Sequence, residues 1–325
     1  MTTMQAILQS GPGRPLQLGR TERPSPGPGQ LLVRVHAAGV NRADLAQAAG
    51  RYPAPAGESP ILGLEIAGEV AALGEGAHGF RVGDAVFGLV AGGGYAEYCV
   101  LDAGLAVHKP AALSWEIAAG LPEAWLTAWL NLVELGGLRA QQRVLIHAGA
   151  SGVGAAAIQL AHVWGAAVAA TAGGADKCAW CRALGAGLAI DHGTEAFAEA
   201  VKAWGGADLI LDTVGGDYLP RNQACLNRDG TIVLIGVLRG TEAHINLGLL
   251  LVKRQRLLGS TLRALPSVRK AQLAAALWPW LLPRLAEGRI RPTPDRSFAL
   301  ADAAAAHAWL AGNRNLGKVV LSVAA

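Results

Sequence analysis

The sequence predicts an α/β protein with two domains, one rich in β-strands and one built on a doubly wound parallel sheet. Three observations predict it. The chain has 325 residues, of which 52% are hydrophobic and 16% charged, so it can bury a large core and exceeds one typical domain. Before residue 120, short apolar runs alternate with Gly and Pro, which is typical of an antiparallel, barrel-like domain. After it, apolar strands alternate with helical stretches, which indicates a parallel sheet.

The β-rich domain is predicted from three apolar runs, over 30–36, 68–73 and 84–90. The segment 23–29 holds three prolines and two glycines, and we interpret it as a loop between strands rather than as a linker. A last apolar strand over 317–323 follows a helical stretch and returns to this domain. We therefore predict a β-rich domain of residues 1–122 and 266–325 and a parallel-sheet domain of residues 123–265.

The most informative stretch is 143–154, where a short apolar run meets a glycine-rich turn and then a helical pattern. Glycines at 149, 152 and 154 allow a tight turn and close approach to a pyrophosphate, while the helix N-terminus offers unpaired N–H groups. Ser151 stands where Gly-x-Gly-x-x-Gly has its second glycine, so a purely structural turn stays an alternative. The predicted dinucleotide loop comprises Gly149, Ala150, Ser151, Gly152, Val153 and Gly154.

The next strand, over 166–171, indicates which dinucleotide binds. NAD-binding versions place Asp or Glu at the end of this strand for the ribose 2′-hydroxyl, and no acid stands there. Gly173 leaves room for a 2′-phosphate, and Lys177 supplies a positive charge within a turn, although a solvated lysine is the commoner fate of that residue type. His192 borders the same adenosine pocket or lies in a surface loop. These residues favour NADP over NAD.

The alternation continues through strands at 207–212 and 230–236 to an edge strand within 255–262. Ligands bind at the carboxyl ends of such strands, which adds Val237 and Leu238 to the predicted cofactor site, their alternative role being strand-end packing. An exposed edge is often paired, so we expect a homodimer that continues the sheet.

Composition and charge exclude several classes of protein. No run of about 18 apolar residues occurs, and the first ten residues lack the basic start and apolar core of a leader, so we predict a cytoplasmic protein without membrane association. The net charge of +4 comes from scattered Lys and Arg, which argues against dedicated nucleic-acid binding. The four cysteines are predicted to be reduced, and Cys178 and Cys181, although spaced as in thioredoxin, are interpreted as structural residues of a helix that ends at Gly185.

The whole arrangement resembles the medium-chain dehydrogenase/reductase superfamily, and within it the zinc-independent NAD(P)H quinone oxidoreductases. The resemblance covers residues 4–325. It is carried by the cofactor loop and by the segments 38–44, 63–69, 82–86, 92–98 and 121–129. It implies a GroES-like catalytic domain and a Rossmann domain with the active site in the cleft between them.

The resemblance also bears on metal and mechanism. Zinc alcohol dehydrogenases have Cys where this chain has Asn41 and His where it has Leu64, and they have a four-cysteine lobe that is missing here, so no metal site is expected. It implies that Asn41 and Thr127 border the nicotinamide and that Tyr52 lies at the mouth of the cleft, where its phenol could bond a carbonyl oxygen or pass on a proton. A structural tyrosine in the loop before Pro53 stays an alternative for Tyr52. We also assign Gly317 and Lys318 to the cofactor site.

The expected reaction is hydride transfer from NADPH to a quinone, with the protein supplying geometry and polarity. Relatives commonly have Ser where this chain has Gly174 and Tyr where it has His192, which weakens the expected NADP preference. Two alternatives stay open. One is an enoyl or alkenal reductase with the same fold and cofactor, and the other is an NADPH-sensing or RNA-binding protein of the lens-crystallin type.

Overall fold

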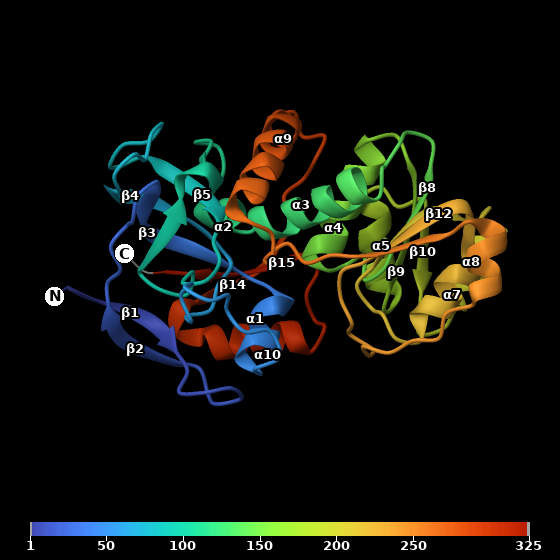
Figure 1. The fold of residues 1–325 in the computed structure, drawn as a ribbon, viewed down its shortest axis with the longest axis horizontal. Coiled ribbons are helices and arrows are strands. Elements are labelled where there is room, and N and C mark those ends of the chain that lie inside the picture. The colour runs from blue at the N-terminus through green and yellow to red at the C-terminus, as the bar shows by residue number, and fades with distance from the viewer. Residues whose placement is uncertain (1, 324–325) are drawn as a thin grey trace. The chain divides into compact units, whose positions relative to one another are not determined.

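The computed structural model describes residues 2–323 and divides them between two compact units (Figure 1). Unit 1 comprises Met1–Glu123, Arg263–Ala276 and Pro292–Ala325, and unit 2 comprises Ala124–Leu262 and Leu277–Arg291. Relative to the boundaries predicted from sequence, residues 277–291 group with the parallel-sheet unit. Among the described residues, no helix is both long and apolar enough to span a bilayer.

Unit 1 is built on a sheet whose strands run in the order β14-β15-β3-β4-β5-β7, with β6 also paired to β3. A separate antiparallel pair joins β1 to β2. All pairings in the larger sheet are antiparallel except that of β14 with β15. The strands are β1 (Thr3–Leu8), β2 (Gln17–Glu22), β3 (Gln30–Val40), β4 (Glu65–Leu73), β5 (Ala85–Leu89), β6 (Tyr98–Asp102), β7 (Ala106–His108), β14 (Pro294–Ala299) and β15 (Lys318–Ser322).

The register of this sheet places three distant segments side by side. β15 pairs with the end of β3, with Val319 opposite Val40 and Val320 opposite Gly39. On the other side of β3, Ala38 pairs with Ile66 at the start of β4. Lys318 and Glu65, which begin β15 and β4, therefore flank the point where the chain leaves β3 and enters helix α1 (Arg42–Ala48).

The remaining helical segments of unit 1 are short. They are η1 (Ala103–Leu105), α2 (Trp115–Ala119), η3 (Leu300–Asp302) and α10 (Ala303–Ala311). Helices α3 (Pro122–Ala128) and α9 (Ser267–Ala286) each begin in unit 1 and continue into unit 2.

Unit 2 contains a six-stranded sheet in the order β10-β9-β8-β11-β12-β13, and every pairing in it is parallel. From β8 the chain winds outward to β10, and then from β11 outward to β13, so the order reverses between β8 and β11. That reversal is where ligands bind in doubly wound sheets. The strands are β8 (Arg143–Ile146), β9 (Ala167–Ala172), β10 (Leu188–Asp191), β11 (Ala207–Asp212), β12 (Leu226–Leu234) and β13 (Arg256–Gly259).

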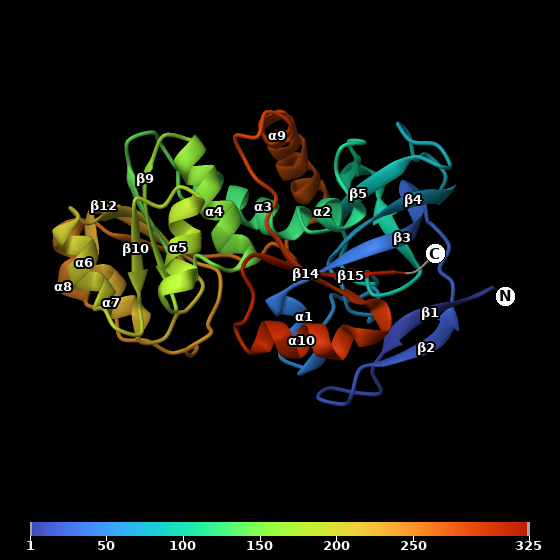
Figure 2. The same ribbon diagram turned by 180° about the vertical axis from the view of Figure 1, so that it is seen from behind.

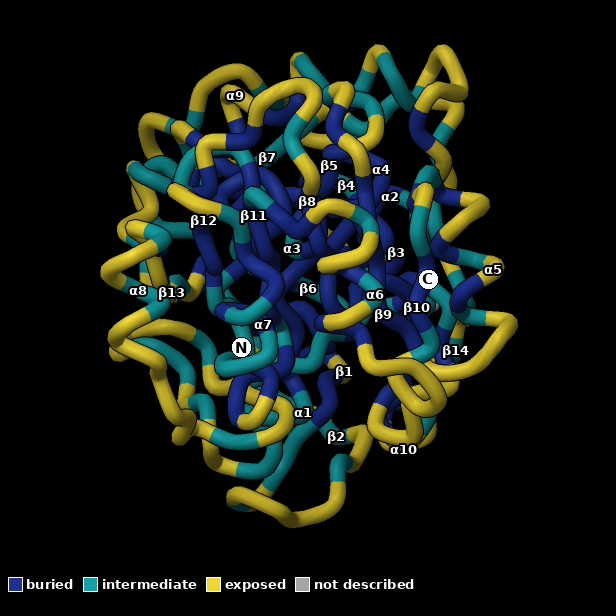
Figure 3. The backbone as a smooth tube through the Cα atoms, turned by 90° about the vertical axis from the view of Figure 1, so that its right-hand side faces the viewer, coloured by how far each residue is buried: buried dark blue, intermediate teal, exposed yellow. Residues whose placement is uncertain are grey.

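Helices cover this sheet, and α4 and α5 pack against β9 (Figure 2). The central strands are almost wholly buried, as the tube through β8 and β11 shows (Figure 3). The predicted α/β class with a parallel Rossmann-type domain is confirmed. The helical segments of unit 2 are η2 (Trp129–Leu135, a π-helix), α4 (Gly152–Val163), α5 (Ala175–Ala183), α6 (Phe197–Ala203), α7 (Tyr218–Cys225) and α8 (Leu247–Lys253).

Candidate active site

The glycine-rich loop of unit 2 joins the end of β8 to the start of α4. Ser151 caps the helix, and its Oγ accepts a hydrogen bond from the backbone N–H of Gly154, 3.0 Å away. A Cβ on Gly154 would lie 2.3 Å from the carbonyl oxygen of Ala148, and a Cβ on Gly149 would lie 2.7 Å from Sγ of Cys181. The two glycines are therefore required by packing, and Ser151 replaces the missing glycine as a helix cap.

All six residues predicted for the cofactor loop fall in this one turn and in the first turn of α4. The helix has 12 residues, long enough for its N-terminus to carry unpaired N–H groups and a positive dipole. The loop also lies beside the reversal of strand order. The backbone geometry thus fits a dinucleotide pyrophosphate, and the cofactor role of the individual residues stays a proposal.

Beneath the loop, a buried chain of polar groups ties three strand ends together. His147 is 0% exposed, with Nε2 2.7 Å from Oδ1 of Asn222 and Nδ1 2.9 Å from Oγ1 of Thr171. Asn222 Nδ2 donates to Asp212, so its Oδ1 must accept from His147 Nε2–H, and the Thr171 hydroxyl then donates to Nδ1. Burial lowers the pKa of His147, which keeps the ring neutral.

At the end of β9, the structure brings Gly173 and His192 together. A Cβ on Gly173 would lie 3.3 Å from Nε2 of His192, so the glycine makes room for the ring. Lys177 lies in the first turn of α5 and is partly buried. Gly173 and His192 are therefore neighbours in space, and Lys177 follows Gly173 by four residues in the chain.

An acid that the sequence argument missed stands beside them. Asp191 ends β10 and pairs in register with Ala172 at the end of β9. Its Oδ1 accepts hydrogen bonds from the backbone N–H groups of Gly174 and Gly193, both at 3.0 Å, and these bonds lower its pKa. The prediction considered only the end of β9 itself, whereas the neighbouring strand supplies a carboxylate that binds the backbone of Gly174.

Val237 and Leu238 follow β12 and are 46% and 57% exposed. A Cβ on Gly215, in the loop after β11, would lie 3.2 Å from Cα of Val237. The loops that follow β11 and β12 therefore touch, and Val237 and Leu238 offer an apolar surface there.

The two cysteines with thioredoxin spacing lie in α5, as predicted, and the helix ends before Gly185, which has a φ of +112°. All four cysteines of the chain are buried and free. Burial raises the pKa of Cys181 to about 12, so it is a thiol at neutral pH, and it packs against Gly149. The structural interpretation of this pair agrees with that environment.

In unit 1, Asn41 lies between a buried ammonium and a buried carboxylate. Lys318 Nζ donates to Asn41 Oδ1 at 2.6 Å and also to Glu65, while Asn41 Nδ2 donates to Glu65 Oε1 at 2.9 Å. Lys318 is 5% exposed and Glu65 is 0% exposed. The second oxygen of Glu65 accepts from the backbone N–H of Glu123 at 2.8 Å. A Cβ on Gly39 would lie 2.0 Å from Glu65 Oε1, so the glycine in β3 makes room for the carboxylate.

A second buried chain begins at the backbone of Asn41. Its N–H donates to Asp44 Oδ2 at 2.7 Å, and the Tyr95 hydroxyl donates to the same oxygen at 3.1 Å. Nε2 of His307, on α10, is 3.2 Å from that hydroxyl. Burial raises the pKa of Asp44 to about 6 and lowers the pKa of His307 to about 4. This chain connects α1 to α10 and fixes the turn that carries Asn41.

Tyr52 is held by Arg263, a residue that the sequence did not single out for this role. The Arg263 guanidinium lies 5.4 Å from the Tyr52 ring, and Arg263 Nη2 donates to the carbonyl oxygen of Ala91 at 2.6 Å. Burial raises the pKa of Tyr52, and the carboxyl group of Glu123 raises it further. Tyr52 therefore keeps its phenolic proton at neutral pH.

The other predicted site residues are placed as follows. Thr127 lies in the part of α3 that belongs to unit 2, is 9% exposed, and accepts at its backbone oxygen from Asn131 Nδ2 at 2.8 Å. Gly317 has a φ of +95°, and a Cβ there would lie 2.2 Å from the oxygen of Thr293, so it lets β15 start close to the segment before β14. The structure thus gives Gly317 a backbone role and Lys318 acceptors inside unit 1.

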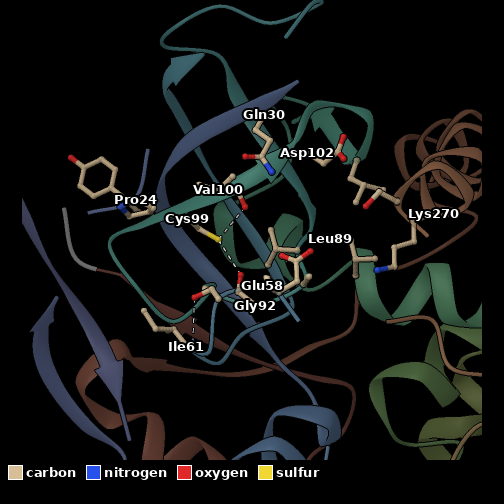
Figure 4. A pocket seen from close by; sticks show the side chains of 18 of the residues that line it. Pro24, Gln30, Glu58, Ile61, Leu89, Gly92, Cys99, Val100, Asp102 and Lys270 are labelled. Carbon is tan, nitrogen blue, oxygen red and sulfur yellow. Dashed lines mark hydrogen bonds between the residues drawn. The ribbon is translucent and has the colours of Figure 1, made fainter. Parts of the chain in front are cut away.

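A cavity of about 290 Å³ lies within unit 1, between β6, the loop 57–61 and the start of α9 (Figure 4). The carboxylates of Glu58 and Asp102 and the ammonium of Lys270 all line it, and Cys99 lies at its wall. Lys270 Nζ donates to the carbonyl oxygen of Arg263 at 2.8 Å. The lining of the cavity therefore carries both signs of charge.

The donor chemistry around Asn41 does not fit a zinc ion. The amide oxygen already binds the Lys318 ammonium, and Leu64 is an apolar side chain, 1% exposed. Among residues 2–323, no three His, Cys, Asp or Glu side chains form a metal-binding group. We therefore derive no catalytic step through a metal.

Two family models match the chain. Residues 27–111 match the alcohol dehydrogenase GroES-like domain and residues 152–279 match the zinc-binding dehydrogenase family. The solved quinone oxidoreductase of Pseudomonas syringae pv. tomato DC3000 is 31% identical, covers 98% of this chain and 99% of its own, and superimposes with a TM-score of 0.88. The chain belongs to the medium-chain dehydrogenase/reductase superfamily. Its β-rich unit is the GroES-like domain, as the resemblance implied.

Other proteins are similar to the chain at comparable identity. A mycobacterial protein, Rv1454c, solved in complex with NADPH, is 31% identical with a TM-score of 0.88 over 98% of this chain and 99% of its own. The CurK enoyl reductase is 29% identical with a TM-score of 0.86 over 99% of both chains. A mycocerosic acid synthase-like polyketide synthase of Mycolicibacterium smegmatis is 34% identical over 95% of this chain, which spans only 15% of that protein.

The residues that sequence reasoning missed are Glu65, Asp44, His147, Asp191 and Arg263. Glu65 and Asp44 lie inside segments that carried the family resemblance, and His147 lies inside the cofactor stretch, so a signal was present without a role attached to it. Asp191 and Arg263 lie outside those segments and had no such signal.

Proposed function

We propose that this chain is an NADPH-dependent quinone reductase that works without a metal. The observation that carries the proposal is the amide of Asn41 held between Lys318 and Glu65, at the position where zinc relatives have a metal ligand. A hydrogen-bond donor backed by positive charge stabilises negative charge on an acceptor oxygen, which hydride addition to a conjugated carbonyl creates. Relatives solved as quinone oxidoreductases support this choice of acceptor.

NADP is the cofactor. The glycine cradle of unit 2 would hold its pyrophosphate at the N-terminus of α4, with Gly173, Lys177 and His192 near the 2′-phosphate and Val237 and Leu238 beside the strand ends. The NADPH complex of the mycobacterial relative supports this cofactor. When bound, NADPH supplies the hydride from C4 of its nicotinamide.

The chain's own residues orient the acceptor and donate or pass on the proton. Asn41 donates a hydrogen bond to the acceptor oxygen, and Thr127 borders the nicotinamide. Tyr52 stays protonated, since its pKa is raised, and can donate to a carbonyl oxygen or pass on a proton. Arg263 fixes the loop that carries Tyr52.

A second candidate is reduction of an enoyl or alkenal carbon–carbon double bond. The similarity to the CurK enoyl reductase and to polyketide synthases favours it. The same hydride and the same hydrogen-bond donor serve both reactions, since in each the negative charge develops on a conjugated oxygen.

The test is anaerobic consumption of NADPH, and separately of NADH, with an ortho-quinone, a para-quinone and an alkenal. We expect turnover with a quinone and a preference for NADPH. Turnover of the alkenal alone would assign the chain to enoyl reduction, and binding of NADPH without turnover of any acceptor would contradict both functions.

We also propose a homodimer through the edge of the parallel sheet. β13 is the last strand of that sheet among the described residues, and the preceding helix α8 exposes Leu247, Leu251 and Val252 at 62%, 75% and 72%. A second copy would cover these side chains and pair the strand edge. Light scattering of wild type and of Leu251→Lys tests it, with a dimer expected for the first and a monomer for the second.

A cytoplasmic location stays a prediction.

A further inference from the structure

Lys318 begins β15, and its ammonium is enclosed by unit 1. It donates to Asn41 Oδ1 at 2.6 Å, to Glu65 Oε1, and to the backbone oxygen of Val40 at 3.4 Å. An ammonium has three N–H bonds, and these three acceptors use all of them. A lysine at 5% exposure with three acceptors has no N–H left for a cofactor phosphate.

The two partners of the Asn41 amide determine which way it points. Lys318 can only donate, so it must face the amide oxygen, and an ionised Glu65 can only accept, so it must face the nitrogen. A flipped amide would set oxygen against carboxylate and N–H against ammonium. The amide therefore has one stable orientation.

This orientation leaves one N–H of Asn41 available. Nδ2 carries two hydrogens, and Glu65 is its single acceptor among the described residues. Asn41 is partly exposed, whereas Lys318 and Glu65 are buried. The Lys318 ammonium bound to the amide oxygen draws electron density away from the amide nitrogen, which makes the remaining N–H a stronger donor.

We infer that Lys318 is a positioning residue that acts through Asn41. It orients the amide and strengthens the N–H that Asn41 offers to the oxygen of the acceptor. This inference rests on the proposed function. In the reaction the acceptor gains a hydride and NADPH becomes NADP⁺. The electron pair that the new bond displaces comes to rest on the acceptor oxygen, which accepts the Asn41 hydrogen bond and then takes a proton from Tyr52 or from water. Lys318 keeps its proton throughout.

The experiment is a double-mutant cycle between Asn41→Ala and Lys318→Met. Because Lys318→Met alone leaves Glu65 as a buried unpaired carboxylate, the cycle is repeated with the neutral pair Lys318→Met/Glu65→Gln, which has no unpaired charge. Lys253→Met is the matched control, since Lys253 also donates to two carbonyl oxygens, those of Ala224 and Leu226, but lies in unit 2. The readouts are the Kd of NADPH, measured by its fluorescence, and kcat with a quinone at saturating NADPH.

We expect the Kd of NADPH to change less than about twofold in the Lys318 variants, while kcat falls about tenfold or more. In the Asn41→Ala background the same Lys318 change should lower kcat by less than about threefold, because the group through which it acts is gone. The control should match wild type in both readouts.

Two results would overturn the inference alone. A Kd for NADPH weakened tenfold or more would show that Lys318 binds the cofactor, and losses in kcat that multiply in the double variant would show that it acts independently of Asn41. If wild type oxidises NADPH with neither a quinone nor an alkenal, the proposed function and the inference fail together.

Discussion

The two candidate binding regions of the molecule differ in the chemical groups that form them. The loop after β8 in unit 2 consists of backbone and small side chains, and the buried network beneath it joins a neutral histidine through Asn222 to the carboxylate of Asp212. The region around Asn41 in unit 1 is held by buried ions and a buried tyrosine. A loop that must approach a large anion closely needs room and N–H groups. A site that must orient one amide needs a cation on one side and an anion on the other.

The largest effect that tests this difference is the loss of one buried charge in unit 1. Glu65→Gln leaves the Lys318 ammonium buried without its counter-ion, and we expect the free energy of unfolding to fall by about 3–5 kcal/mol. Glu69→Gln on the same strand breaks the exposed pair with Arg34 and should cause no measurable change. Urea denaturation of both variants checks this. Equal losses would remove the contrast between buried and exposed pairs.

The next effect concerns the pH dependence of stability in unit 1. The folded pKa of His307, about 4, lies below its unfolded value of about 6.5, so the unfolded chain binds the proton first and stability falls as pH drops from 6.5 toward 4. His307→Gln keeps a donor for Tyr95 and never titrates. Relative to this variant, wild type should lose up to about 3 kcal/mol of unfolding free energy over that range.

Asp44 changes the stability with pH in the opposite direction to His307, over an overlapping range of pH. Its folded pKa, about 6, lies above its unfolded value, so its contribution is present at low pH and is lost as pH rises through 6. The two groups partly cancel in wild type, and the His307→Gln variant should therefore become less stable from pH 4 to pH 6. Parallel pH profiles of unfolding for the two proteins would contradict the assignment.

In unit 2 we expect stability and NADPH binding to depend on the space around Gly149 rather than on a buried charge. A methyl group on Gly149 would lie 2.7 Å from Cys181 Sγ and 2.9 Å from the Cβ of Ala170, so Gly149→Ala should cost about 1–3 kcal/mol and weaken NADPH binding. Cys181→Ala in the same chain should restore part of both. Gly187→Ala is the control, because its nearest neighbour would be the Val168 oxygen at 3.8 Å. Fluorescence titration and thermal unfolding measure the two effects, and no rescue by Cys181→Ala would exclude the clash as the cause.

The smallest effect concerns the choice of cofactor. Asp191→Asn removes a carboxylate near the predicted 2′-phosphate position and should raise the preference for NADPH over NADH a few-fold, while Lys177→Ala should lower it. The ratio of kcat/KM for the two cofactors is the measurement. Unchanged ratios in both variants would place the 2′-phosphate elsewhere.

The two regions also differ in how far the sequence predicts them. The cofactor loop is read from six adjacent residues because a glycine turn before a helix is a local pattern. The helix predicted to end at Gly185 ends at Ala183, and the strand predicted over 317–323 spans 318–322. The Asn41 network could not be read in this way. Lys318 lies 277 residues from Asn41, and only the register of β15, β3 and β4 brings them together.

Two features show why local patterns fall short. The sequence assigned Lys318 to the cofactor site, and that assignment stays a prediction, whereas the partners Asn41 and Glu65 that the structure gives Lys318 were not predicted. It also found no acid at the end of β9, since Asp191 is supplied by the next strand. Strand neighbours decide both cases, and they are set by the topology of the sheet.

The most direct test of the account is single-turnover oxidation of NADPH, carrying deuterium at C4, by a quinone under anaerobic conditions. The account predicts that one quinone is reduced per NADPH, that deuterium in the transferred position slows the step, and that Asn41→Ala slows it further without weakening NADPH binding. NADPH that binds tightly but is oxidised by neither a quinone nor an alkenal would contradict it.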